Sequence, residues 1–173
     1  MKRLLYFLIL LTFSCSESTV APDDQRVGFD YFPLQTGQYA IYDIESITFD
    51  ILGTIDTSRF QLKVEVVDSF QSLAGDFTYV IHRFHRNTGT DPWEFQAAWT
   101  RYRTPHQAVQ VEENVAFLKL TFPVEEGKIW DGNRVNTMDT DEYELDSLGV
   151  PFVTVTNDTI PNTLTVIQNN NED

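Results

Sequence analysis

From residue 29 onward, apolar and polar residues alternate with a period of two, and this pattern restricts the fold more than any other feature of the sequence. A period of two is typical of a β-strand that buries one face and exposes the other to water. The segment 59–66 shows it most clearly, with apolar residues at Phe60, Leu62, Val64 and Val66 and polar residues between them. No later segment keeps the 3.6-residue period of an amphipathic helix. The sequence therefore predicts an all-β domain.

The same pattern predicts strands along the rest of the chain, separated by short clusters of Gly, Pro, Asn, Asp and Ser. Strands joined by short turns pair antiparallel, because a parallel pair needs a crossover of about a dozen residues or more. We therefore expect a single antiparallel domain of about nine or ten strands, whose curved sheet closes toward a sandwich or a partial barrel. The other predicted strands are 39–49, 77–86, 93–103, 108–112, 115–122, 128–130, 142–145, 152–156 and 164–168.

One short motif occurs twice, as FPLQTG at residues 32–37 and as FPVEEG at residues 122–127. Proline fixes one backbone angle and glycine permits a positive φ, so each copy predicts a stiff reversal before a strand. Two copies indicate two equivalent corners of the sheet. A further turn is predicted at Asp131-Gly132-Asn133, because Asp-Gly favours the tight hairpin turn.

The first fifteen residues have the form of a secretory signal that ends at the only cysteine, Cys15. Lys2 and Arg3 precede an apolar run over 4–11, which is shorter than the ~20 residues of a membrane-spanning helix. The segment resembles a bacterial lipoprotein signal peptide, with the small residue Ser14 before the cysteine, although Thr12 departs from the family's usual aliphatic residue. The resemblance implies that residues 1–14 form a signal helix that is removed. Cys15 would then carry fatty acyl chains such as palmitate; the alternative is a plain secretory signal and a free thiol.

An acylated Cys15 would leave no thiol for a disulfide, a zinc site or a nucleophile. Several acyl chains would hold the protein durably on a membrane, which is therefore its expected partner. Residues 15–27 are small, polar and acidic, and they predict a flexible linker. Residues 28–173 would form the β domain.

The charge balance excludes one class of partner. The chain has 12 basic and 26 acidic residues, and loss of Lys2 and Arg3 would leave 10 against 26, a net charge of −16. Nucleic acids and bare anionic lipid surfaces, which both present dense negative charge, are poor partners for such a chain, because phosphate binding needs cationic contacts. An acidic, soluble surface is expected, and no cofactor is predicted.

Several motifs together resemble a family of uncharacterised cell-envelope lipoproteins of Bacteroidota-type bacteria. They are Tyr31 to Leu34 with Gly37, Tyr39 and Tyr42, Phe122-Pro123 with Gly127, and Trp130 to Asn133 with Asn136. The resemblance implies a lipid-anchored protein of the outer membrane, on its periplasmic or its surface side. Relatives usually continue past a strand like 164–168, so we expect either a truncated chain or an edge strand there. Two tripeptides, at Ser147 and Thr159, also resemble O-glycosylation sites of such bacteria.

Trp93, Phe95 and Trp99 are the candidate ligand-binding residues, because they fall on one face of a predicted strand. An exposed aromatic row would bind a sugar or an acyl chain, whereas a buried row would belong to the core, which the composition favours. His82 and His85 lie three apart in a strand and would point to opposite faces, so they predict no metal site.

The acidic residues of segment 139–146 alternate with Tyr143 and Leu145 and predict a solvated strand face rather than a calcium loop. No acid, base and nucleophile pattern indicates a catalytic site. The leading hypothesis is a non-catalytic envelope lipoprotein that binds or assembles with envelope proteins. The alternatives are a lipid- or glycan-binding domain and, less favoured, a hydrolase.

Overall fold

The computed structural model describes residues 24–51, 53–73 and 75–168, which form two short helical turns and nine strands. In chain order these are α1 (Asp24–Val27), η1 (Phe29–Tyr31), β1 (Tyr39–Phe49), β2 (Ile55–Gln71), β3 (Phe77–Arg86), β4 (Glu94–Arg103), β5 (Gln107–Glu112), β6 (Val115–Thr121), β7 (Ile129–Asp131), β8 (Glu142–Val153) and β9 (Thr159–Gln168).

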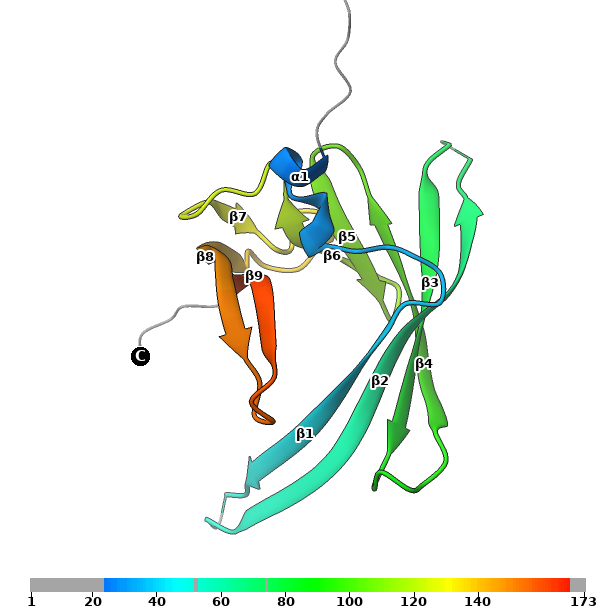
Figure 1. The fold of residues 1–173 in the computed structure, drawn as a ribbon, viewed down its shortest axis with the longest axis vertical. Helices are drawn as coiled ribbons and strands as arrows, with labels where there is room; N and C mark the ends of the chain where they lie inside the picture. Colours follow the sequence, from blue (N-terminus) through cyan, green and yellow to red (C-terminus); the bar gives the residue numbers. More distant parts are fainter. Residues whose placement is uncertain (1–23, 52, 74, 169–173) are drawn as a thin grey trace, which may run out of the picture.

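The strands form two antiparallel sheets. Strands β1 to β6 pair in chain order in the larger sheet, and β7, β8 and β9 form the smaller one. The larger sheet curls into a half-barrel, and the β8–β9 hairpin stands opposite β1 and β2 (Figure 1). The predicted all-β antiparallel fold is confirmed, and of the two expected closures the structure has the partial barrel.

The β1–β2 hairpin is the longest pairing in the half-barrel. Strand β1 has the predicted bounds, whereas β2 extends well beyond the predicted segment 59–66. Tyr42 pairs with Leu62, and Ile44 pairs with Phe60, so these four side chains share one face. We call this the inner face of the larger sheet, because it is turned toward the β8–β9 hairpin (Figure 1).

The two copies of the repeated motif form equivalent corners, as predicted. Gly37 has φ 87° and Gly127 has φ 77°, a region that favours glycine. Gly37 N–H donates to the carbonyl of Val66, and Gly127 N–H donates to the carbonyl of Leu145, each at 2.7 Å. Both acceptor residues donate in return to the carbonyl of the residue after the glycine, at 2.9 Å. Each motif therefore starts its strand against a buried residue of a partner strand.

The smaller sheet differs from the prediction at β8. This strand joins the predicted strands 142–145 and 152–156 through the segment where a turn was expected, with Gly149 at φ 72° and with three register shifts along the β8–β9 pairing. A bulged strand absorbs extra residues without reversing, which explains the error. Ser147 consequently pairs with Thr165 inside the sheet and not in a turn, whereas Thr159 is exposed at the start of β9. Within the described chain β9 pairs with β8 alone, so the predicted edge position of 164–168 is confirmed.

The tight hairpin turn predicted at Asp131-Gly132-Asn133 is wrong, because a loop over 132–141 joins β7 to β8. Glycine is needed at 132 for close packing. A Cβ atom there would lie 2.5 Å from Cζ of Tyr143, whose side chain is buried.

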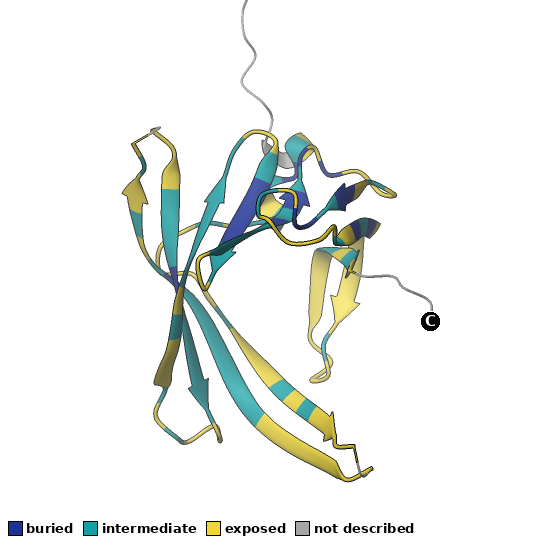
Figure 2. Ribbon diagram, turned by 180° about the vertical axis from the view of Figure 1, so that it is seen from behind, coloured by how far each residue is buried: buried dark blue, intermediate teal, exposed yellow. Residues whose placement is uncertain are grey.

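The hydrophobic core lies at the end of the molecule where β5 to β8 meet (Figure 2). Its buried members come from both sheets, and Val27, Phe29 and Phe32 of the N-terminal segment pack against it. The far ends of β1 and β2 are exposed (Figure 2). The buried core residues are Ala108, Val109, Leu118, Leu120, Phe122, Val124, Trp130, Tyr143 and Leu145.

The predicted signal helix of residues 1–14 and the candidate lipidation site Cys15 lie outside the described residues, as does most of the predicted linker 15–27. The last four linker residues form α1, and Val27 accepts a hydrogen bond from Val124 N–H at 3.1 Å. These four residues therefore belong to the folded domain. Within the described ranges, no helix is long and apolar enough to cross a membrane.

Candidate functional site

The three candidate aromatic residues do not form one row. Phe84 pairs with Phe95, but Arg83 pairs with Ala97, so a β-bulge adds one residue to β4 and reverses the alternation. Phe95 therefore lies on the outer face with His82, at 5.2 Å between ring centroids. Trp99 lies on the inner face, where the Arg83 guanidinium stacks on it at 4.0 Å. The prediction of a single aromatic face is wrong, because the bulge shifts the alternation between Phe95 and Trp99. No sequence pattern marks this bulge.

The alternative prediction, that this row forms the core, is also wrong. Phe95 is 58% exposed, and neither Trp93 nor Trp99 is among the buried core residues. Trp93 is covered instead by the Arg86 guanidinium, at 4.1 Å from its ring. Cations stacked on both indoles leave less aromatic surface free for a sugar.

The histidines are placed as predicted, on opposite faces of β3. His82 contacts the rings of Phe84 and Phe95, whereas His85 contacts Phe60 of the inner face at 5.2 Å. In the part of the chain that the structure describes, no group of three or more His, Cys, Asp or Glu side chains is arranged to hold a metal ion.

The acidic segment 139–146, which runs into β8, packs as the alternation predicted. Tyr143 and Leu145 are buried, and Glu142 and Asp146 are exposed. Burial raises the pKa of the Tyr143 hydroxyl to about 12, and the neighbouring Asp141 carboxylate acts in the same direction. A neutral tyrosine is therefore the form that the fold favours.

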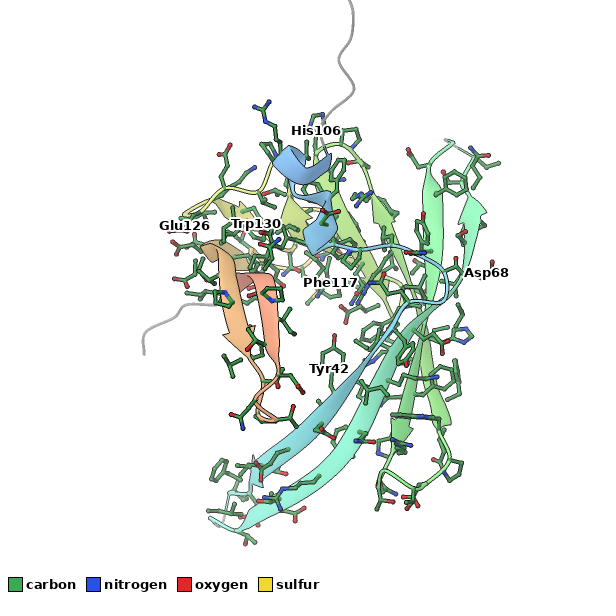
Figure 3. All side chains as sticks on the ribbon, in the orientation of Figure 1. Tyr42, Asp68, His106, Phe117, Glu126 and Trp130 are labelled. Atoms are coloured by element: carbon green, nitrogen blue, oxygen red, sulfur yellow. The ribbon has the colours of Figure 1, made fainter. Side chains whose placement is uncertain are left out.

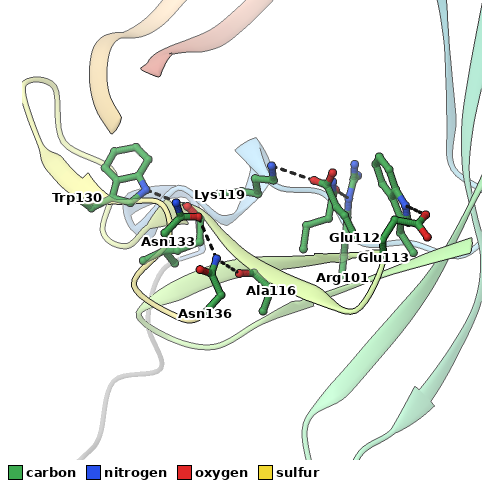
Figure 4. A network of polar contacts seen from close by, with 11 residues as sticks. Arg101, Glu112, Glu113, Ala116, Lys119, Trp130, Asn133 and Asn136 are labelled. Carbon is green, nitrogen blue, oxygen red and sulfur yellow. Dashed lines mark hydrogen bonds and ion pairs between the residues drawn. The ribbon is translucent and has the colours of Figure 1, made fainter. Parts of the chain in front are cut away.

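The polar residues of the 130–136 motif hold the loop onto β6 rather than a ligand (Figure 4). Trp130 Nε1–H donates to the carbonyl of Leu118 at 3.0 Å. Asn136 Nδ2–H donates to the carbonyl of Ala116 at 2.7 Å and to Oδ1 of Asn133 at 2.9 Å. The motif is therefore structural, as expected of turn and core residues.

A pocket of about 440 Å³ lies on the inner face, between the start of β1 and the N-terminal segment. Phe32, Ala40, Tyr42, Val64 and Val66 supply its apolar walls. Figure 3 shows Tyr42 projecting from β1 toward the β8–β9 hairpin. The volume lies within the ~300–1,000 Å³ of small-molecule sites. The pocket is therefore large enough to receive a small ligand.

Arg101, Gln110 and Lys119 supply the polar side of this pocket. Arg101 Nε–H donates to Oε1 of Gln110, which is only 6% exposed. Gln110 Nε2–H donates to Glu112 at 2.6 Å, and Lys119 Nζ pairs with the same carboxylate oxygen at 2.9 Å (Figure 4). Burial lowers the pKa of Arg101, so its charge sits in a partly dehydrated site.

Sequence reasoning did not find this site. Alternation places Trp99, Arg101 and Arg103 on one face of β4, which was a usable signal. It does not say which face becomes concave, and the facing residues come from β1, β2, β5 and β6.

A comparison of the chain with protein-family models finds no match, and neither the curated proteins nor the solved structures contain one. The resemblance to Bacteroidota-type lipoproteins therefore rests on the sequence motifs alone.

Proposed function

We propose that this protein is a non-catalytic lipoprotein of the outer membrane, anchored through Cys15, whose half-barrel binds a small ligand on its inner face. The observation that carries the binding function is the pocket of about 440 Å³ with a buried amide, Gln110, on its wall. Ligand pockets combine apolar walls with a few polar side chains that fix the orientation of the ligand. The anchor is supported by the form of residues 1–15.

The proposed binding surface differs from the one expected from the sequence. The inner-face pocket replaces the row of Trp93, Phe95 and Trp99, since the bulge divides that row between two faces. A non-catalytic role is consistent with the separation of His82 from His85 and with the use of Asn133 and Asn136 in loop packing.

Assembly with another envelope protein is the second candidate function. Strand β1 is an edge of the larger sheet, and its far end carries exposed apolar side chains at Ile47 and Phe49. An exposed apolar edge favours pairing with a further strand.

The test is native mass spectrometry of the protein released gently from envelopes, with mass spectrometry of everything that accompanies it. We expect a small molecule in stoichiometric amount. Ala40→Phe places a ring inside the pocket and should abolish this adduct, whereas Ile41→Phe, on the opposite face of the same strand, should retain it. An adduct that survives Ala40→Phe, or a protein partner in place of a small molecule, would contradict the proposal.

A further inference from the structure

The cations of this acidic protein are unevenly distributed. The chain has a net charge of −14. Yet Arg101 and Lys119 line one pocket, and Arg83 lies on the same face, paired across the sheet with the pocket residue Val64. A strongly acidic surface repels anions in general, so a local concentration of cations in a concave site selects for an anion there.

The Arg101 guanidinium is only partly used by the protein. Its Nε–H is held by Gln110, and its face lies 5.5 Å from the ring centroid of Phe32. Gln110 also separates it from Glu112, whose carboxylate already accepts bonds from Gln110 and Lys119. A guanidinium has five N–H donors, and a partly buried cation is costly unless an anion pairs with it.

A second guanidinium on the inner face, that of Arg83, also has an unused donor. Nε of Arg83 is buried, and it has no hydrogen-bond partner among the described residues. Its guanidinium group stacks on Trp99 at 4.0 Å, which fixes its position on the inner face. Arg83 therefore adds to the inner face a cation with an unused donor, beside Arg101 and beside Lys119, which is paired with Glu112.

An apolar track leads away from this positive end. On β2 it comprises every second residue from Phe60 to Val66, all on the inner face. These residues span about 20 Å at ~3.3 Å per residue. Ile44 and Phe60 at its far end line a second pocket, of about 530 Å³, together with Val155 between β8 and β9. The track thus has the width of two strands and is faced by the β8–β9 hairpin.

We infer that the inner face binds an anionic amphiphile, with its head group on Arg101 and Lys119 and its apolar chain along the β1–β2 track. This inference rests on the proposed binding function and names its ligand class. A carboxylate and a phosphate monoester share the required head-group chemistry, because both accept paired hydrogen bonds from a guanidinium.

The test measures calorimetric affinities of the full chain carrying Cys15→Ser, purified without detergent, for three ligands with the same acyl chain. The ligands are oleate, oleoyl lysophosphatidate and the uncharged oleyl alcohol. We expect at least one anion to bind about tenfold or more tightly than the alcohol, which is the scale of a charge-assisted hydrogen bond. The preferred anion identifies the head group as a carboxylate or a phosphate.

Arg101→Met should remove most of this preference, measured as the ratio of anion to alcohol affinity in the same variant, and Arg101→Lys should keep part of it. Lys119→Met is the second pocket variant and provides the same comparison if Arg101→Met does not fold. The matched control is Arg134→Met, which removes an exposed cation in the loop after β7. Equal affinity for the alcohol and the anions, or anion binding that survives both pocket variants, would overturn the inference. Failure of all three ligands would overturn it too, while the Ala40→Phe comparison on envelope protein would still decide the proposed function.

Discussion

Gly132→Ala tests the close packing of the loop after β7 against Tyr143 of β8. The new Cβ would lie 2.5 Å from Cζ of Tyr143, and 2.7 Å and 2.8 Å from the neighbouring ring carbons. The Tyr143 ring is 3% exposed and packs edge-to-face on Trp130 at 5.9 Å, so it has little room to retreat. Forced overpacking of a core costs about 1–3 kcal/mol. We therefore expect the free energy of unfolding to fall by about 2 kcal/mol.

Urea denaturation followed by tryptophan fluorescence measures this loss. With a typical slope of ~1–3 kcal/mol per molar urea, the midpoint should fall by roughly 1 M. The matched control is Gly89→Ala, because a Cβ at that exposed glycine would meet no atom within 4 Å. Its midpoint should be unchanged or slightly higher. An unchanged midpoint for Gly132→Ala, or an equal loss for Gly89→Ala, would refute the packing argument.

Three further outcomes are expected. Because the pKa of Tyr143 is raised to about 12 in the fold, against about 10 when unfolded, the stability that this shift contributes is present below pH ~10 and is lost as pH rises through ~12. Tyr143→Phe should flatten that loss in denaturation curves, and parallel curves would contradict the assignment. Asn133→Ala removes the bond to the carbonyl of Asp139 at 2.6 Å and should cost about 1–3 kcal/mol in thermal melts, whereas Asn87→Ala in an exposed loop should cost nothing measurable. Shortening β9 by removing residues 164–168 should expose Leu145 and Tyr143 and increase binding of a hydrophobic dye, and unchanged dye binding would show that β9 does not cover the core.

The period of two predicted most of the half-barrel, because strands in a sheet with one covered face must alternate. The 39–49 and 77–86 segments form strands with those bounds. The repeated motif was also predictable, since Gly37 and Gly127 both need the positive φ that glycine permits. These features depend on local backbone geometry, which residue type and alternation predict directly.

The errors have non-local causes. The bulge in β4 separates Trp99 from Phe95, and the bulges in β8 replace an expected turn around Gly149. Register shifts depend on the partner strand, so local alternation does not reveal them. The pocket at Arg101 was not predicted for a similar reason, because its walls come from strands far apart in the sequence.

The most direct test of the account replaces the sulfur that would carry the anchor. Envelope fractions from cells that produce the wild-type chain or Cys15→Ser are separated by ultracentrifugation, and the protein is quantified in pellet and supernatant. The wild-type protein should sediment with the membranes, and Cys15→Ser should be recovered in the soluble fraction, since several acyl chains together give durable attachment. Cys15→Ser that sediments to the same extent as wild type would contradict the lipid anchor and, with it, the proposed role at the membrane.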